Sequence, residues 1–135
     1  MHVLINIDVD DLARGVAFYT QAFGWQEARH LGDSVIELLG AQAPVYLLRK
    51  PAGTPAVAGQ AVPRHYARHW TPVHLDIVVP DVDAAVQRAL AAGAVLEQAA
   101  QTHPWGRLAL LADPFGHGFC LLQFLGRGYD EGAAA

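Results

Sequence analysis

The chain carries the same order of features twice. Residues 4–24 and residues 74–93 each read as an apolar strand, an aspartate at a helix start (Asp11 or Asp81), an amphipathic helix and a terminal glycine. A repeated unit of this kind is usually one half of a structure, because it cannot bury its apolar face alone. We therefore expect the two copies to pair around one site, and differences between the copies to indicate function.

The composition is that of a globular protein. Of the 135 residues, 53% are hydrophobic and 16% are charged, which argues against disorder. The net charge is −4 with no basic stripe, so nucleic acid is not an expected partner. The single cysteine, Cys120, fits a reducing compartment. No signal peptide and no membrane-spanning apolar run are evident, so we expect a cytoplasmic protein with no membrane partner.

The hydrophobic periodicity predicts an α+β fold, with the order βαβββ, linker, βαβββ. One domain is expected, made of two repeats, 1–50 and 72–124, joined by a flexible linker at 51–71 that is rich in Pro, Gly and Ala. Residues 126–135 are predicted to form a frayed tail. Helices are predicted at 12–23 and 81–92, and strands at 3–9, 25–30, 35–39, 45–49, 74–79, 95–99, 108–111 and 119–124.

Two local motifs carry a family resemblance. Residues 11–19 read Asp-Leu-Ala-Arg-Gly-Val-Ala-Phe-Tyr and are followed by Phe23-Gly24, and residues 113–117 read Asp-Pro-Phe-Gly-His before the last strand. With the repeat, this arrangement resembles the vicinal oxygen chelate superfamily: glyoxalase I, the extradiol dioxygenases and the bleomycin resistance proteins. The resemblance covers residues 3–124. It implies two βαβββ modules that form a cupped mixed sheet around a cavity, commonly in a homodimer.

The resemblance also implies where a metal would bind. Metal-dependent members place ligands on the first and last strands of each module, at positions that correspond to Leu4, Tyr46, His74 and Cys120. Only His74 matches the usual His, Gln or Glu. A catalytic metal needs about three protein ligands. We therefore expect no metal or other cofactor, as in the metal-free bleomycin resistance branch.

The alternation of the strands predicts the pocket. If even-numbered positions face the cavity, the lining is an apolar wall with a few hydrogen-bonding groups, as in many small-molecule sites. Asp76 would lie beside His74 and would either orient its imidazole ring or favour the charged, protonated form of that ring. Alternatively, His74 is a satisfied core histidine and Asp76 lies in solvent at the sheet end. The predicted ligand-binding residues are Leu4, Asn6, Tyr46, Leu48, Tyr66, Trp70, His74, Asp76, Trp105 and Cys120.

Several other side chains allow two interpretations. His65 and His69 have the spacing of a zinc helix, but the required glutamate is missing, which favours a solvated linker. Tyr66 and Trp70 either cover the cavity, seal a dimer or belong to that linker. Trp105, in the 103–106 turn, either stacks on a ligand at the cavity mouth or only completes the turn.

Two residues of the first repeat are also ambiguous. Trp25 begins a strand and is expected in the core or in an interface. Glu37, within the apolar run 35–39, is either on the solvent face or a buried acid, and the pattern favours solvent.

The leading functional hypothesis is a metal-free protein that binds a flat small molecule, such as an antibiotic or an aromatic metabolite, with no catalytic residue. The rival is a lyase, isomerase or dioxygenase of the same superfamily with an altered site. There, His74 would be a general base or a metal ligand together with Cys120. A third hypothesis is a dimerisation domain without a ligand. A homodimer is expected, because Trp25, Tyr66 and Trp70 are more large aromatics than exposed segments should carry.

Overall fold

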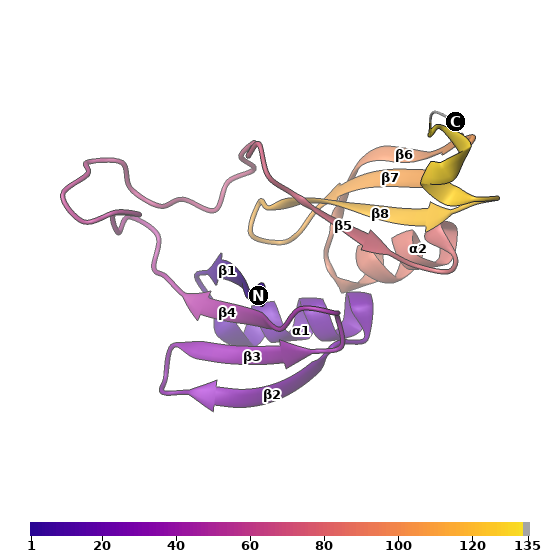
Figure 1. Ribbon diagram of the computed structural model, residues 1–135. Helices are drawn as coiled ribbons and strands as arrows, with labels where there is room; N and C mark the ends of the chain where they lie inside the picture. Colours follow the sequence, from indigo (N-terminus) through magenta and orange to yellow (C-terminus); the bar gives the residue numbers. More distant parts are fainter. Residues whose placement is uncertain (134–135) are drawn as a thin grey trace. The chain divides into compact units, whose positions relative to one another are not determined.

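A computed structural model describes residues 1–133 (Figure 1). The predicted order βαβββ, linker, βαβββ is confirmed. The elements are β1 (Ile5–Val9), α1 (Leu12–Phe23), β2 (Gln26–Leu31), β3 (Val35–Leu39), β4 (Val45–Arg49), β5 (Leu75–Val78), α2 (Val82–Ala92), β6 (Val95–His103), β7 (Gly106–Ala112), β8 (Gly118–Phe124) and the 3-10 helix η1 (Gly128–Glu131).

Helix α1 has the predicted bounds, and α2 ends as predicted but begins at Val82, one residue after the predicted start, because Asp81 caps it. The carboxylate of Asp11 accepts from the backbone N–H of Arg14 at 3.0 Å, and that of Asp81 accepts from Ala84 at 3.1 Å. Each therefore satisfies one of the unpaired donors at a helix start. Both helices end at a glycine in the left-handed region, at φ 70° for Gly24, which a residue without Cβ adopts at little cost.

The repeat produces two sheets of the same topology. Their strand orders are β1-β4-β3-β2 and β5-β8-β7-β6, and in each the first pair is parallel and the others are antiparallel. The register is repeated as well, because Asn6 pairs with Tyr46 and Asp76 pairs with Cys120. The repeat thus places equivalent residues side by side in each sheet.

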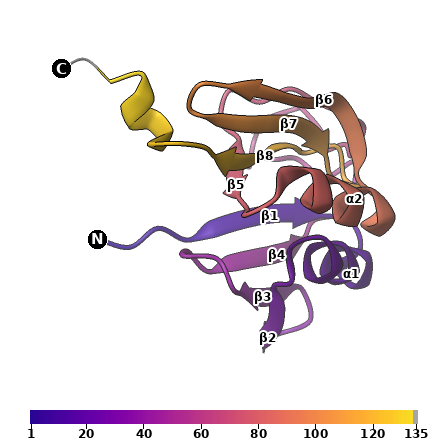
Figure 2. The same ribbon diagram turned by 90° about the vertical axis from the view of Figure 1, so that its right-hand side faces the viewer.

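The chain divides into two compact units, Met1–Ala67 and a second unit from Arg68 onward. Within each unit, the helix covers one face of its sheet (Figure 2). In the first unit, a Cβ added at Gly15 would lie 3.0 Å from Leu47 and 3.4 Å from Val9, so α1 packs closely on the odd-numbered face of β1 and β4. The residues that alternate with these lie on the opposite face of the sheet.

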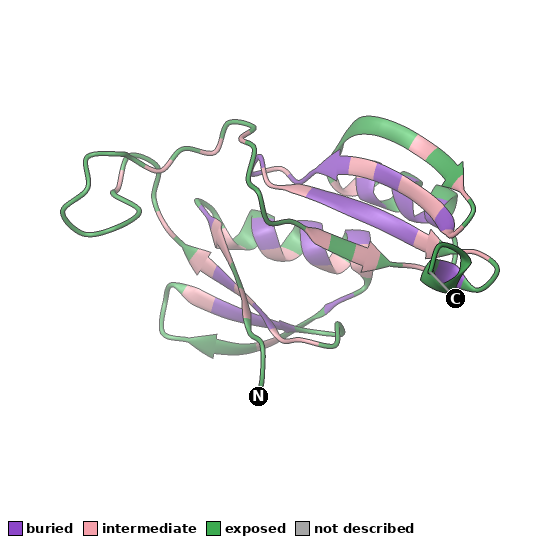
Figure 3. Cartoon of the chain, turned by 45° about the horizontal axis from the view of Figure 1, so that its top comes forward, coloured by how far each residue is buried: buried purple, intermediate pink, exposed green. Residues whose placement is uncertain are grey.

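Helix α2 packs in the same way on β6, β7 and β8. Its buried side chains include Val82, Val86 and Ala89, and Leu111 and Leu121 are fully buried in the strands. The edge strands β2 and β6 are mostly exposed, as Figure 3 shows.

Some boundaries differ from the sequence prediction. β1 and β5 begin at Ile5 and Leu75, so the sheets start after Leu4 and His74. β6 continues to His103 because two bulges, between Leu96 and Gln101, absorb the loss of alternation in the middle of the strand. The predicted frayed tail contains η1, whose Tyr129 contacts Phe124. The last two residues of that tail lie outside the described residues.

Candidate functional site

The second unit contains a pocket of about 190 Å³ on one side of its sheet. Three predicted ligand-binding residues line it, namely Trp70, His74 and Cys120. Leu110 and Phe119 contribute apolar surface, and Trp70 is 80% exposed. The full lining is Arg68, Trp70, Thr71, His74, Glu97, Leu110, Leu111, Gly118, Phe119 and Cys120.

His74, Asp76 and Cys120 form a polar cluster at this pocket. His74 Nε2 lies 3.2 Å from Asp76 Oδ1, and the ligand atoms of the three residues all lie within 4.8 Å of one another. Asp76 is on β5 directly beside Cys120 on β8. Burial raises the pKa of the Cys120 thiol to about 11, and the charge of Asp76 and a hydrogen bond to it add to the increase. The thiol is therefore protonated at neutral pH and is a weak nucleophile.

The segment Arg68–Thr71, which we call the strap, forms one wall of the pocket. The Arg68 guanidinium donates to both carboxylate oxygens of Glu97 on β6, at 2.6 and 2.8 Å. It also donates to the carbonyl of Gly116 at 3.4 Å and to that of His69. A Cβ at Gly118 would lie only 2.6 Å from the guanidinium, so the glycine leaves room for Arg68 against β8. The pairing with Glu97 raises the pKa of Arg68 and lowers that of Glu97.

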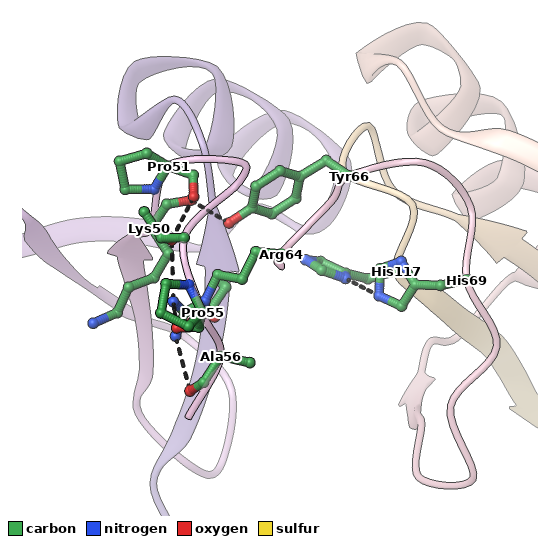
Figure 4. Close-up of polar contacts among 10 residues, drawn as sticks. Lys50, Pro51, Pro55, Ala56, Arg64, Tyr66, His69 and His117 are labelled. Atoms are coloured by element: carbon green, nitrogen blue, oxygen red, sulfur yellow. Dashed lines mark hydrogen bonds and ion pairs between the residues drawn. The ribbon is translucent and has the colours of Figure 1, made fainter. Parts of the chain in front are cut away.

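The strap is also tied to the turn before β8. His69 Nε2 lies 3.2 Å from His117 Nδ1, and the two rings meet edge to face (Figure 4). The buried carboxylate of Asp113 holds that turn by accepting from the backbone N–H groups of Phe115 and His117, at 2.8 and 2.9 Å. His69 is half-buried rather than a solvated linker residue, and the segment that contains it is not a helix. The zinc-helix interpretation of His65 and His69 is therefore wrong.

The first unit holds a different polar network at the equivalent place. Glu37 accepts from the hydroxyl of Tyr46 at 2.8 Å and from Arg29 Nε and Nη2 at 2.8 and 2.6 Å. The sequence favoured a solvent-exposed Glu37, but only 4% of the residue is exposed, so it is the buried acid of the alternative. Its bonds to Arg29 and Tyr46 lower the pKa of Glu37 to about 2. The pKa of Tyr46 is raised, chiefly because its hydroxyl donates to Glu37.

The other predicted residues of the first unit lie on β1 and β4 or beside them. Asn6 and Leu48 lie on the same sheet face as Tyr46, by strand register and alternation. Leu4 precedes β1 and is 59% exposed. The hydroxyl of Tyr66 donates to the carbonyl of Lys50 at 2.5 Å (Figure 4).

The segment that follows β4 is held by Arg64. Its guanidinium donates to Asp8 at 3.0 Å and to the carbonyls of Pro55 and Ala56, at 2.6 and 3.4 Å. Thr54 Oγ1 accepts another bond, at 3.2 Å. These contacts give residues 51–67 a defined path within the first unit.

The remaining tryptophans lie apart from these sites. Trp105 stacks on His103 at a centroid distance of 4.9 Å and contacts Tyr129, and it is not among the residues that line the pocket. Trp25 is buried and stacks on Tyr19 at 5.6 Å, which assigns it to the core of the first unit.

Two of the four family positions offer little to a metal ion. Leu4 has no ligand atom, and the hydroxyl of Tyr46 donates to Glu37. His74, Asp76 and Cys120 within the second unit are a different donor set and are close enough to share an ion. An ion there would have to displace the proton of Cys120.

Sequence reasoning missed Arg68, Glu97 and Arg29. Arg68 and Glu97 are 29 residues apart, and no periodic pattern connects a linker arginine to an edge strand. The only signal for Arg29 was the unexplained acid Glu37 on the neighbouring strand of the same hairpin.

Comparison with known proteins identifies the family. A family model described as a glyoxalase-like domain matches residues 4–122. The chain therefore belongs to the glyoxalase-like domain family, within the vicinal oxygen chelate superfamily. An uncharacterized protein of Mycobacterium bovis is 34% identical over 121 residues, which cover 87% of this chain and 80% of the relative.

Solved structures share the fold. A glyoxalase-related enzyme from Fulvimarina pelagi superposes with a TM-score of 0.71 at 22% identity, covering 91% of this chain and 87% of that one. TnmS3, an antibiotic binding protein from Streptomyces sp. CB03234, has a TM-score of 0.64 at 23% identity, with 93% and 96% covered. One fold thus serves both an enzyme and a binding protein, so function has to be argued from the site.

Proposed function

We propose that this chain is a metal-free small-molecule-binding protein that sequesters an antibiotic-like or aromatic compound, as in resistance by stoichiometric binding. The pocket beside Trp70, Leu110 and Phe119 carries the proposal, because it joins an exposed aromatic face to a small polar cluster. Such pockets bind by apolar burial and a few oriented hydrogen bonds. The likeness to an antibiotic binding protein supports this choice.

The chemistry of the cluster also favours binding over nucleophilic catalysis by Cys120. Asp76 lies near both His74 and Cys120, and the high pKa of Cys120 makes it a poor nucleophile. The other predicted residues, Leu4, Asn6, Tyr46, Leu48, Tyr66 and Trp105, remain part of the proposal as further contacts for a ligand.

A thermal-shift screen of aromatic compounds in the presence of EDTA tests the proposal. A ligand at 100 times its Kd should stabilise the protein by about 2.7 kcal/mol. Stabilisation lost on Trp70→Ala and kept on Tyr129→Ala, an exposed aromatic of the same unit that does not line the pocket, would assign binding to the pocket. A hit that requires added metal, or one equivalent of Zn²⁺, Fe or Ni²⁺ in chelator-free protein that is lost on His74→Ala, would contradict the metal-free proposal.

A second candidate function rests on one contact. The 3.2 Å approach of His74 to Asp76 at the edge of a pocket is the arrangement of a general base and its orienting carboxylate. It favours a lyase, isomerase or dioxygenase of the same superfamily. Turnover that disappears in His74→Ala but not in Cys120→Ser would support this enzyme, whereas a ligand recovered unchanged from the protein supports sequestration.

We also propose a cytoplasmic homodimer. None of the helices in residues 1–133 is long and apolar enough to cross a membrane. Of the three aromatics behind the dimer expectation, Trp25 is buried and Tyr66 half-buried, which leaves Trp70 as the one that is largely exposed. Sedimentation at micromolar concentration tests the dimer, and a monomer there would contradict it.

A further inference from the structure

We propose that the pocket of the second unit takes an aromatic ring that carries a positive charge, with Asp76 as its counter-charge. The inference rests on the proposed binding function and names the chemical class of the ligand. It follows from the size of the pocket, its exposed aromatic wall and the balance of charges around it.

The size of the pocket sets the scale of the ligand. An apolar cavity of about 150 Å³ holds one benzene ring. The pocket of about 190 Å³ therefore accommodates one ring and a small substituent. Leu110 and Phe119 provide apolar surface, and Trp70, with 80% of its surface exposed, offers a π face at the wall. An indole face attracts organic cations within about 6 Å.

The charges around the pocket are predominantly negative. With histidine counted as neutral, the lining residues Arg68 and Glu97 carry opposite charges that offset each other. The excess negative charge comes from Asp76, beside His74 and Cys120, and from the buried Asp113, which is close enough to raise the pKa of Arg68. The Arg68 guanidinium is held by both oxygens of Glu97 and by the Gly116 carbonyl, so it is already committed within the protein. An anionic ligand would therefore meet a net negative environment.

Asp76 does not itself line the pocket, but its carboxylate lies within 4.8 Å of the ligand atoms of His74 and Cys120, which do. No ion pair between Asp76 and an arginine or lysine is found within residues 1–133. Its neighbours are the His74 imidazole at 3.2 Å and the Cys120 thiol, and its side chain is 37% exposed. The negative charge of Asp76 acts on Cys120, because together with burial it raises the pKa of the thiol. An ammonium or amidinium group placed over His74 and Cys120 would gain from this charge.

Three ring compounds of similar size separate charge from shape. Benzylamine, as the ammonium form, benzyl alcohol and benzoate are titrated into isotopically labelled protein at neutral pH with EDTA, and the shifts of the Cys120 amide and the Trp70 indole are followed. The ammonium should bind about fivefold more tightly than the alcohol, the scale of a half-exposed ion pair, and benzoate should bind most weakly. High salt should reduce the preference.

The variant Asp76→Asn should remove most of the preference and leave the affinity for benzyl alcohol nearly unchanged. Asp83→Asn is the matched control, because Asp83 is a carboxylate of the same unit that pairs with Arg107 and does not line this pocket. It should keep the preference.

Equal binding of all three compounds, or a preference that survives Asp76→Asn and high salt, would overturn the inference and leave the binding function standing. No shift with any of the three would instead count against the pocket as a binding site. If the ammonium bound only after EDTA was replaced by Zn²⁺, a metal cation would be the occupant and the inference would be wrong.

Discussion

The hydroxyl of Tyr46 donates to the carboxylate of Glu37 at 2.8 Å, across neighbouring strands of the first sheet. Arg29, from the next strand, completes the network with two further bonds to the same carboxylate. In the second sheet, the residue paired with Cys120 at the place of Glu37 is Leu110. The two repeats therefore present different chemistry at equivalent positions, a salt-bridged acid in one and an apolar wall in the other.

The Glu37 network should make folding stability depend on pH. The pKa of Glu37 is lowered from an ordinary value of 4.5 to about 2 in the folded protein. A carboxylate whose pKa is lower in the folded than in the unfolded protein stabilises the fold at pH values above its unfolded pKa. This stabilisation is lost as the pH falls through the folded pKa. We therefore expect this contribution to disappear as the pH is lowered from about 4.5 to about 2.

Glu37→Gln provides the comparison. The difference in Tm between wild type and Glu37→Gln should shrink steadily as the pH is lowered through that window. Thermal unfolding in a series of acidic buffers measures it. A difference that stays constant from neutral to strongly acidic pH would show that the ionised form of Glu37 does not stabilise the fold.

The thiol of Cys120 should react slowly. With a pKa raised to about 11 by burial and by Asp76, the thiolate is a small fraction of the cysteine at mildly alkaline pH. We expect iodoacetamide to modify native Cys120 much more slowly than the same cysteine in urea. Asp76→Asn should speed the native reaction, because it removes the negative charge beside the sulfur. An unchanged rate in this variant would mean that burial alone controls the thiol.

Much of the fold could be predicted because it rests on local signals. The aspartates at 11 and 81 cap helices, glycines end them, and alternation marks the strands, so each element is readable within its own segment. The bulges of β6 were not readable, because Gln98 and Gln101 interrupt the alternation without a turn residue. The predicted end of β6 was therefore wrong because the local alternation of apolar and polar residues breaks down within that strand.

The candidate site was less predictable, because its walls depend on contacts between distant residues. His74, Asp76 and Cys120 come together through a register that the repeat suggested. Arg68 reaches Glu97 and Gly116 only because the strap folds onto the sheet, and nothing in a Pro- and Ala-rich linker indicates that. Similarly, the partner of Glu37 depends on a β2–β3 register that is shifted by a bulge.

Substitution of His74, but not of His65, should weaken ligand binding. His74 lines the pocket, whereas His65 is exposed and does not line it. For a ligand found by thermal shift, His74→Ala should weaken binding by about 1 kcal/mol, since it removes a hydrogen-bonding partner at the site. His65→Ala should have no measurable effect by calorimetry. The reverse pattern would move the site to the segment between the repeats.

The ion pair of Arg68 should matter for binding more than its exposure suggests. Its planar guanidinium bridges Glu97, Gly116 and the strap while lying against Gly118, a geometry that a lysine ammonium cannot reproduce. Arg68→Lys keeps the charge and loses the two-pronged contact. We therefore expect the strap to loosen and ligand affinity to fall about threefold, consistent with a partly exposed ion pair.

Arg107→Lys is the control for this prediction. Arg107 makes a similar two-pronged contact with Asp83 at 3.0 and 3.2 Å in the same unit, but it does not line the pocket. The variant Arg107→Lys should leave ligand affinity unchanged, and the Trp70 indole signal should shift only in Arg68→Lys. Equal losses in both variants would mean that the strap acts through general stability. Unchanged affinity in Arg68→Lys, despite a shifted Trp70 signal, would show that the ligand does not depend on this wall.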